Sequence, residues 1–438
     1  MASQSIIPIP ADSPFSLANI PFGIFSTLSQ PHPRPGVAIG EHILDLRVLA
    51  LEGIFTDCKV TFPSDVLTHT TLNAFAALGR PTTSGVRAYI QSLLSQSSSL
   101  LHLNPSLLER CTVKQIEATM HLPFDIGDFT DFTSSKTPDV CDTACKKTRT
   151  RDMDMGVLML TCTFHPPRAA SGRVSTILPS GTPIVRPVGH LPPSASPERS
   201  YSGLLEDKAL DDLPSDTPVD SRTLARTTGF SLAPTSELDF ELELAFFISV
   251  PTEHFERVPV EKTEEHIFGV VLLNDWSARD IQIPETLPFG AFNAKNFAST
   301  ISPWVVTLDA LEPFKIAHDI RRVPSYLVDK GDATYDISVS MRVIPGGLME
   351  KEMGGGEIML AFHTLSGCRM RTGDLIGTGT LSGEDTISLC SLIEQRKHFP
   401  NRMFLQDRDE VVFTAWCGSL QRGVGFGECR GVVLPARL

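Results

Sequence analysis

Short runs of apolar and β-branched residues, separated by glycine and proline, dominate the chain after about residue 118. In chain order these runs read STILPSGTPIV, LDFELELAFFISV, IFGVVLLND, SPWVVTL, YDISVSMRVI, EVVFTAW and GVVLPA. Their length and punctuation favour a β-sandwich or β-roll over a doubly wound α/β fold. We therefore expect residues 119–438 to form one domain that consists mostly of sheet, with few long helices.

The first 118 residues have a different pattern. Two short strand-like runs, GVAIG and HILDL, precede two helical patterns at about 71–77 and 85–101. This order predicts a small N-terminal domain over residues 1–118. Within the second domain, proline, serine, aspartate and threonine become dense between about 192 and 236. Such a composition predicts a low-complexity surface insertion.

Segment 238–250 carries acids inside one of the most apolar runs of the chain. Because the side chains of a strand alternate between its two faces, Asp239, Glu241 and Glu243 share one face. An ordinary amphipathic strand would turn this face to solvent. The apolar continuation AFFISV instead favours a strand that is buried on both sides. Acids buried there would need a cation.

Residues 267–282 change from a strand pattern to a helix pattern at Asn274. Asp275, Arg279 and Gln282 follow at spacings of four and three, which places them on one helical face. One interpretation is a site at which these three side chains converge. The other is an ordinary helix start, with Asn274 or Asp275 as N-cap and an ion pair from Asp275 to Arg279.

Other segments hold further polar candidates. Lys295 and Ser299 lie in a nearly uncharged stretch, where a buried lysine usually needs an anionic neighbour. FDIGDFTDF places Asp125, Asp128 and Asp131 among glycine and aromatic residues, a pattern typical of a turn whose aspartates bond their own backbone. GTGTLSG lacks the G-x-G-x-x-G spacing of a dinucleotide loop, so we expect a turn between strands.

Composition narrows the class of protein. Of the 438 residues, 41% are hydrophobic and 20% charged, as in soluble globular proteins. No apolar stretch reaches the roughly 18 residues of a membrane helix. The net charge of -13 argues against a nucleic-acid or anionic-lipid partner, so we expect a small-molecule partner.

The expected location is the cytoplasm. The first residues lack the pattern of a secretory signal, and nine scattered cysteines suit reduced thiols better than a disulfide framework. The last three residues, Ala436, Arg437 and Leu438, loosely resemble a peroxisomal address. The peroxisome is therefore the alternative location.

Several segments together resemble the fumarylacetoacetases. They read NIPFGIFST, GVAIGEHILDL, ATMHLPFDIGDFTDF, SGTPIVRP, LDFELELAFFI, EHIFGVVLLNDWSARDIQ, STISPWVV, RTGDLIGTGTLSG and VGFGECRGVVLPA. They are spread over most of the chain, and the ELE and NDWSARDIQ segments in combination are highly specific. The resemblance implies a β-rich α+β fold, with a small SH3-like N-terminal domain before a mixed β-sandwich roll, usually in a homodimer.

The resemblance also implies an activity, the metal-assisted hydrolysis of a carbon-carbon bond in a 1,3-diketo acid. In this family the substrate is fumarylacetoacetate, the products are fumarate and acetoacetate, and the reaction ends tyrosine and phenylalanine breakdown. The residues that match the ligands of a divalent cation, usually Ca²⁺, are Asp131, Glu241, Glu243 and Asp275. Ligation by carboxylates alone suits Ca²⁺ or Mg²⁺ better than zinc.

The remaining site residues also come from the resemblance. Those that match a second, structural Mg²⁺ position are Asp275, Lys295 and Ser299, the last standing where the family usually has threonine. Those that match substrate contacts are Arg279, Gln282 and Thr380, and Glu394 matches the acid that orients the catalytic base. A 1,3-diketone can chelate the cation, and Arg279 and Lys295 would donate where negative charge grows. With Glu394 they form the expected catalytic set.

Between residues 133 and 171 the resemblance breaks down. The family's base is a histidine seven residues after the matched Asp131, where this chain has Pro138. Alignment on MGVLML instead places Arg151 there. The positions of family substrate contacts, tyrosine or arginine, hold Thr133, Leu160, Ala170 and Thr286. True divergence and a faulty coding sequence both explain losses that are flanked by close matches.

Three functions therefore stay open: a fumarylacetoacetase-like hydrolase, a catalytically impaired paralogue that binds a metal and a ligand, and a β-keto acid decarboxylase on the same scaffold. The missing histidine favours the second and third. The same segment holds Cys141, Cys145, Cys162 and His165 as C-x3-C and C-x2-H, ligands that zinc accepts in a spacing of no standard finger. His165 is also an alternative base.

Overall fold

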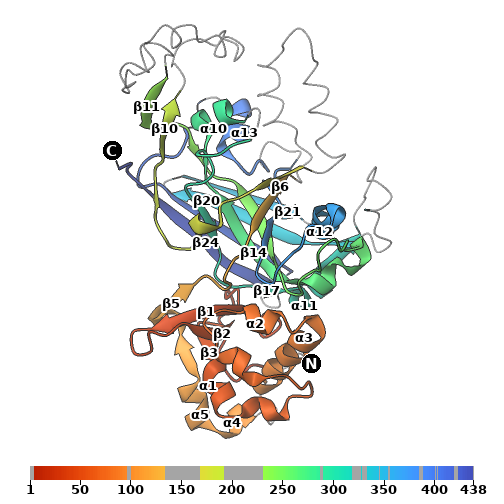
Figure 1. The fold of residues 1–438 in the computed structure, drawn as a ribbon. Coiled ribbons are helices and arrows are strands. Elements are labelled where there is room, and N and C mark those ends of the chain that lie inside the picture. Colours follow the sequence, from red (N-terminus) through yellow and green to blue (C-terminus); the bar gives the residue numbers. More distant parts are fainter. Residues whose placement is uncertain are drawn as a thin grey trace, which may run out of the picture.

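The computed structural model arranges the chain as three main sheets with short helices around them (Figure 1). None of the described helices has the length and apolar character needed to cross a bilayer. The structure describes residues 4–95, 100–133, 168–191, 230–286, 290–317, 327, 333–344, 346–353, 356–383, 388–399, 401, 403–418 and 423–437.

The N-terminal part, red to orange in Figure 1, is an antiparallel sheet of order β4-β3-β2-β1-β5 with five α-helices and three short 3-10 helices among its described residues. Its strands are β1 (Phe22–Thr27), β2 (Arg34–Ile39), β3 (His42–Asp45), β4 (Thr112–Lys114) and β5 (Ala118–His121). Its helices are α1 (Leu46–Leu51), α2 (Asn73–Ala76), α3 (Arg80–Leu93), α4 (Leu100–Leu103) and α5 (Pro105–Arg110). The predicted helix at 85–101 starts earlier because Gly79 and Pro81 begin α3 at Arg80.

The largest sheet is mixed and has the order β7-β6-β22-β13-β14-β16-β8, with β17 also paired to β14. Its strands are β6 (Phe129–Thr133), β7 (Arg168–Ser171), β8 (Ile177–Pro179), β13 (Leu242–Ile248), β14 (Ile267–Asp275), β16 (Ser299–Ile301), β17 (Val306–Thr307) and β22 (Leu375–Gly377). The β6–β22 and β8–β16 pairs are parallel. GTGTLSG itself forms no helix, as predicted, and leaves the sheet at β22, but the next described element is helix α13 (Leu392–His398), so the prediction of a turn between two strands is wrong.

The third main sheet has the order β21-β20-β23-β24-β9. It packs against the largest sheet through a shared core. Its strands are β9 (Ile184–Val185), β20 (Ile337–Ile344), β21 (Gly346–Met353), β23 (Glu410–Cys417) and β24 (Val424–Leu434). The helices of this part are α10 (Arg279–Glu285), α11 (Leu308–Leu311), α12 (Gly356–His363) and α13 (Leu392–His398). The prediction of a β-rich chain with two packed sheets after residue 118 is confirmed.

Three two-stranded ladders complete the described part of the chain. They are β10 (Val188–Leu191) with β11 (Ser231–Pro234), β12 (Leu238–Asp239) with β15 (Ser277–Ala278), and β18 (Lys315–Ala317) with β19 (Ala333–Tyr335). Most of the insertion predicted at 192–236 lies outside the described residues, and β11 falls in its described end.

Side chains from distant segments change two predicted elements. The single strand expected at 238–250 is interrupted, because the backbone N–H of Phe240 binds the Asp239 side chain and that of Glu241 binds Asn274 Oδ1. The helix expected from Asn274 begins only at Arg279. Pairing of Asn274 and Asp275 with β16 keeps both residues in strand β14.

Strand β13 is buried on both faces, as its apolar pattern predicted. Leu244 and Phe246 point into the core between the two large sheets. Ala245 and Phe247 belong to a different core, which also contains Phe22 of the N-terminal sheet. The alternative of a solvent-facing strand is wrong, and acids on this strand are removed from water.

Phenylalanine rings fill the core that joins the N-terminal sheet to β13 and β14. The ring centroids of Phe22 and Phe75 each lie 5.9 Å from that of Phe268 on β14. Phe124 packs against the same ring at 5.6 Å and stacks on Phe247 at 4.3 Å. The two parts of the chain therefore share one continuous apolar interior.

Candidate metal centre and active site

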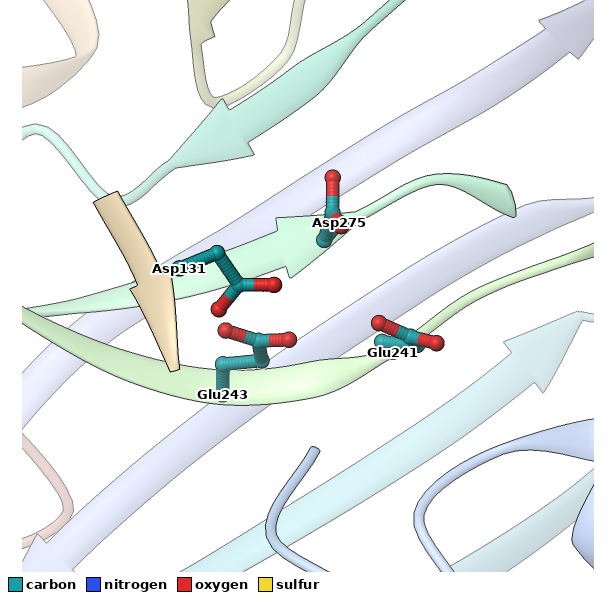
Figure 2. A group of neighbouring side chains, drawn as sticks. All are labelled: Asp131, Glu241, Glu243 and Asp275. Carbon is teal, nitrogen blue, oxygen red and sulfur yellow. The ribbon is translucent and has the colours of Figure 1, made fainter. Parts of the chain in front are cut away.

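Four carboxylates from separate segments meet near the ends of β13 and β14, two central strands of the largest sheet (Figure 2). Asp131 comes from β6, Glu243 from β13 and Asp275 from the end of β14, while Glu241 precedes β13. One ligand oxygen from each lies within 4.8 Å of the others. Within the part of the chain that the structure describes, no second group of acids, histidines or cysteines is arranged in this way.

Strand β22 places a glycine between two of these acids. Gly377 pairs with Asp131 on one side and with Ala245 on the other. A Cβ atom at position 377 would lie 3.0 Å from Asp131 Oδ1 and 3.2 Å from Glu243 Oε2. The missing side chain therefore leaves the space between the two carboxylates open.

Asp131 and Glu243 face each other with unpaired oxygens. Figure 2 shows the two carboxylates opposed, and Asp131 Oδ1 and Glu243 Oε1 are buried without a hydrogen-bond partner. Burial and the nearby Asp275 raise the pKa of Asp131 from 3.8 to about 8, and burial and Asp131 raise the pKa of Glu243 well above its usual range. Orphaned carboxylate oxygens at an open gap fit a hard divalent cation.

Lys295 neutralises the other two acids. Its Nζ atom donates to Glu241 Oε2 and to Asp275 Oδ2, both at 2.6 Å, and Ser299 Oγ donates to Asp275 Oδ1 at 3.0 Å. Although burial opposes ionisation, Lys295 and Arg279 bring the pKa of Glu241 to about 2. Against the same burial, Asp275 and Glu241 raise the pKa of Lys295. The predicted acidic neighbour of Lys295 is confirmed.

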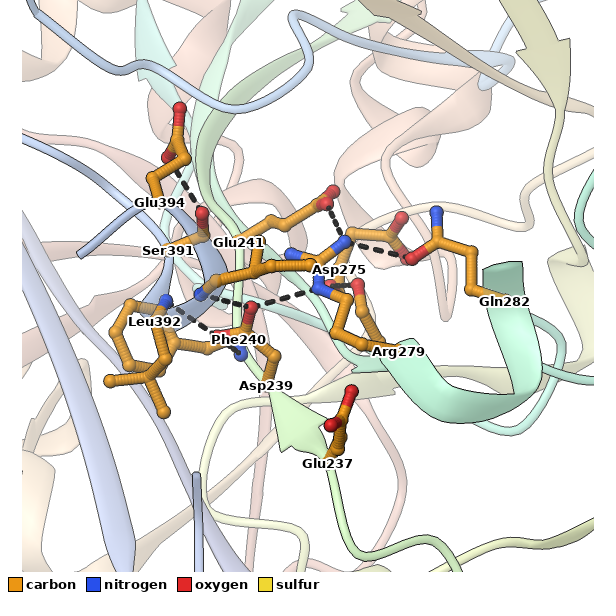
Figure 3. A network of polar contacts seen from close by, with 12 residues as sticks. Glu237, Asp239, Phe240, Glu241, Asp275, Arg279, Gln282, Ser391, Leu392 and Glu394 are labelled. Atoms are coloured by element: carbon orange, nitrogen blue, oxygen red, sulfur yellow. Dashed lines mark hydrogen bonds and ion pairs between the residues drawn. The ribbon is translucent and has the colours of Figure 1, made fainter. Parts of the chain in front are cut away.

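Arg279 begins α10 and is almost fully buried. Its Nε donates to Asp239 Oδ2 at 2.8 Å, and its Nη1 donates to Glu241 Oε1 at 2.7 Å and to Gln282 Oε1 at 2.9 Å (Figure 3). The interpretation of an ordinary helix start with an Asp275–Arg279 ion pair is therefore wrong. The convergent interpretation holds, because Glu241 binds both Arg279 and Lys295, and Lys295 in turn binds Asp275.

Glu394 and Thr380 lie beside this cluster on different segments. Glu394 is buried in the first turn of α13, where Ser382 Oγ and Ser391 Oγ each donate to its Oε2 at 2.6 Å. Burial raises the pKa of Glu394 despite these two hydroxyls. Thr380 is half-buried and follows Gly379, whose N–H donates to Glu243 Oε2 at 3.1 Å. The roles assigned to Thr380 and Glu394 stay predictions.

The turn predicted around Asp131 is wrong for that residue, which lies in β6 and joins the acid cluster. Asp128 pairs through its side chain with Arg371, and the N–H of Asp125 binds Asn73 Oδ1. Sequence reasoning missed the role of Asp239, which binds Arg279. Asp239 could have been proposed as a site residue, because the sequence places it on the same face of segment 238–250 as Glu241 and Glu243.

Residues 133–171, over which the resemblance breaks down, are only partly described. Pro138, Arg151 and Leu160 lie outside the described residues, as do all four members of the proposed zinc pattern, Cys141, Cys145, Cys162 and His165. Thr133 ends β6, and Ala170 of β7 lies directly opposite Asp131 in the ladder. Thr286 Oγ1 donates to the backbone oxygen of Gln282 at 2.8 Å. Of these described substitutes, Ala170 lies next to the acid cluster in the sheet, whereas Thr286 contacts the backbone of α10.

Cation binding is expected to release protons and to strengthen as pH rises. Because burial and neighbouring acids raise the pKa values of Asp131 and Glu243, Ca²⁺ affinity should rise between pH 6 and 8 by about tenfold per pH unit for each proton released. In the unfolded chain the Asp131 carboxyl group has its ordinary pKa of 3.8, so it loses its proton at a lower pH than in the folded chain. The free energy of unfolding without cation should thus fall from about pH 4 to 8.

Calorimetric Ca²⁺ titrations at pH 6, 7 and 8, each in two buffers of different ionisation enthalpy, measure the affinity and the protons released. Urea unfolding without Ca²⁺ over the same range measures the change in stability. An affinity that is the same at pH 6 and 8 would show that Asp131 does not exchange a proton for the cation.

Comparison with known proteins gives a consistent result. The family model described as "Fumarylacetoacetase N-terminal" matches residues 18–123, and the one described as "Fumarylacetoacetate (FAA) hydrolase C-terminal" matches residues 213–434. Proteins named fumarylacetoacetase from Emericella nidulans, Mus musculus and Homo sapiens are 38%, 37% and 35% identical to this chain. The alignments cover 98%, 99% and 99% of this chain and 98%, 99% and 100% of those proteins.

Among solved structures, a fumarylacetoacetate hydrolase from Exiguobacterium antarcticum matches with a TM-score of 0.50 at 16% identity. The match covers 95% of this chain and 100% of that one. At this identity the likeness concerns the fold alone.

Proposed function

The chain belongs to the fumarylacetoacetase family, and from this premise we propose that it hydrolyses fumarylacetoacetate to fumarate and acetoacetate, the last step of tyrosine breakdown. The observation that carries the proposal is the group of four carboxylates, three buried and Asp131 half-buried, with unpaired oxygens on Asp131 and Glu243, beside the cations Lys295 and Arg279. Full-length relatives that bear the name of this enzyme support it.

The cation that we propose for this cluster is Ca²⁺, held by Asp131, Glu241, Glu243 and Asp275. Carboxylate oxygens from separate strands, with no nitrogen or sulfur ligand among them, support a hard cation. The proposed second position, for Mg²⁺, adjoins Asp275 and Ser299. An ammonium group has no free lone pair, so the side chain of Lys295 neutralises these acids and cannot itself ligate a metal.

The described side chains suit the electrostatic demands of this reaction. A divalent cation bound at the acids supplies polarisation of the two carbonyl groups of a 1,3-diketone. Lys295 keeps its proton because two acids raise its pKa, so its ammonium group can donate toward the oxygen on which negative charge grows. Arg279 Nη2 is buried without a partner and offers two further N–H groups to an anionic oxygen.

The reaction adds one water across the carbon-carbon bond. The hydroxyl group goes to the fumaryl carbonyl carbon, and a proton goes to the carbon that becomes the methyl group of acetoacetate. Both products are carboxylates, and the cationic side chains of Lys295 and Arg279 complement their charge.

Finer features of the family belong to the same proposal. These are an SH3-like N-terminal domain and a homodimer; separately, the scattered cysteines support the proposal of a cytoplasmic location. The antiparallel five-stranded sheet at the N-terminus supports the first. Analytical ultracentrifugation of the purified chain tests the second.

The assay follows the ultraviolet absorbance of fumarylacetoacetate with purified chain and Ca²⁺, and identifies fumarate and acetoacetate by chromatography. Hydrolysis that a chelator abolishes and Ca²⁺ restores would support the proposal. Binding of the diketo acid without products would support the impaired paralogue instead, the reading favoured by Pro138 at the position of the family's histidine base. Release of carbon dioxide from a β-keto acid would support the decarboxylase.

This chain, with Pro138 at the position of the family's histidine base, is expected to turn over at least about a hundredfold more slowly than the Mus musculus relative, because general base catalysis contributes about 10² to 10⁴-fold. A chimera carrying that relative's segment in place of residues 133–171 should recover the rate. The two proteins and the chimera are compared at saturating substrate and Ca²⁺. Equal rates for the unaltered chain and the relative would mean that another residue acts as base, with His165 the first to replace.

A further inference from the structure

Asp239 is a buried acid to which the proposed reaction assigns no role. It is fully buried and lies in β12, which pairs with β15 just before Arg279. Four donors fill its two oxygens (Figure 3). The backbone N–H groups of Phe240 and Leu392 bind Oδ1 at 2.8 and 2.7 Å, and the N–H of Ile393 and Nε of Arg279 bind Oδ2 at 3.0 and 2.8 Å.

These bonds leave no oxygen of Asp239 for a cation or a substrate. Instead they join the start of α10, at Arg279, to the first turn of α13, which carries Glu394. The carboxylate thereby fixes two site elements that are more than a hundred residues apart in the sequence. Its position between them is not explained by the acid cluster, of which it is not a member.

Asp239 also fixes the rotation of the Arg279 guanidinium. That group is planar, so a bond at Nε to Asp239 and bonds at Nη1 to Glu241 and Gln282 determine where its third nitrogen lies. Nη2 is the nitrogen that remains, buried and without a partner. The Arg279 side chain is only 1% exposed, so an unpaired Nη2 is costly unless it binds a ligand. An anionic oxygen is the ligand that suits this cationic donor.

We propose that Asp239 is a positioning residue of the reaction, which acts through Arg279 by holding Nη2 toward an oxygen of the substrate. The inference rests on the proposed hydrolysis of a diketo acid and deepens it. With Asp239 absent, Arg279 would keep Glu241 and Gln282 as partners on one nitrogen only, and the guanidinium plane could rotate about that contact. The substrate oxygen would then lose a fixed donor.

The test is a double-mutant cycle with Asp239→Asn, Arg279→Met and the double variant, all measured with saturating Ca²⁺. Asp239→Asn should lower kcat about 10- to 100-fold, with little change in KM. This is the range found for groups that orient the ligands of a metal ion, and we apply it here to the orientation of Arg279. In the Arg279→Met background the same substitution should change kcat less than about twofold. Calorimetric titration with acetoacetate measures the binding affinity of the same four proteins. The cycle can therefore be evaluated on affinity even if the turnover is too slow to compare.

Asp280→Asn is the matched control, because Asp280 is the next residue of α10 but binds Ser236 and not Arg279. It should leave kcat unchanged. Circular dichroism gives the folded fraction for each variant, and Asp239→Glu takes the place of Asp239→Asn if the latter does not fold. If Asp239→Asn lowered kcat by the same factor in the unaltered chain and in Arg279→Met, the inference would be overturned and the proposed function would stand. If the unaltered chain neither cleaved the diketo acid nor bound acetoacetate, both would be overturned.

Discussion

Replacing Glu243 by glutamine is expected to weaken Ca²⁺ binding by more than about a hundredfold, since even residues that only orient metal ligands account for about 10- to 100-fold. Glu243 faces Asp131 with an unpaired oxygen, and the glutamine keeps its shape but removes its charge. Polarisation by a bound metal supplies several kcal/mol, so hydrolysis at limiting Ca²⁺ should fall by on the order of 10³-fold.

Calorimetry measures the Ca²⁺ affinity of this variant, and the absorbance assay measures its turnover over a range of Ca²⁺ concentrations. Glu261→Gln removes the same charge from an exposed position and should change neither quantity. If Glu243→Gln bound Ca²⁺ as tightly as the unaltered chain, the acid cluster would not be the cation site.

Lys295→Met should lower the free energy of unfolding by about 3 to 5 kcal/mol when no divalent cation is present. The substitution removes the ammonium group that contacts both Glu241 and Asp275, and it leaves two buried acids without this partner. Because a bound cation replaces part of the lost positive charge and stabilises the folded state, Ca²⁺ should reduce the difference. Hydrolysis in the presence of Ca²⁺ should be lost.

Urea unfolding with and without Ca²⁺ measures both parts of this expectation. The exposed Lys262, changed to methionine, is the control and should unfold as the unaltered chain does. Unchanged stability of Lys295→Met in the absence of cation would mean that the Lys295 ion pairs contribute little to folding.

The sequence predicts those features of the fold that depend on local patterns. The apolar runs mark β13, β14, β20, β23 and β24, and the run at 238–250 also indicates burial on both faces. The interruption at Phe240 and Glu241 was not predictable, because Asn274 takes a backbone donor there from 33 residues away. Similarly, Asp275 remains in a strand through its pairing with Ser299, which no local period records.

The acid cluster was predictable in part for the same reason. Glu241 and Glu243 stand out within one strand, and Lys295 stands out as a charge in an uncharged stretch. Asp131 alone indicated a turn, because its role depends on the pairing of β6 with β22, far away in the sequence. Residue identity at Asp131, Thr380 and Glu394 became informative only through the resemblance of whole segments to one family.

The phenylalanine core shared by the N-terminal sheet and β13 has a consequence for how the protein loses its structure. Phe247 is covered by Phe124, and through Phe268 the contact extends to Phe22 in β1. Separation of the two parts would expose this aromatic surface to water, so we expect the N-terminal sheet and β13 to unfold together. Since Glu243 and Phe247 occupy the same strand, we expect a substitution in the aromatic core of the N-terminal sheet to lower activity by lowering the amount of folded protein, far from any group that touches the substrate.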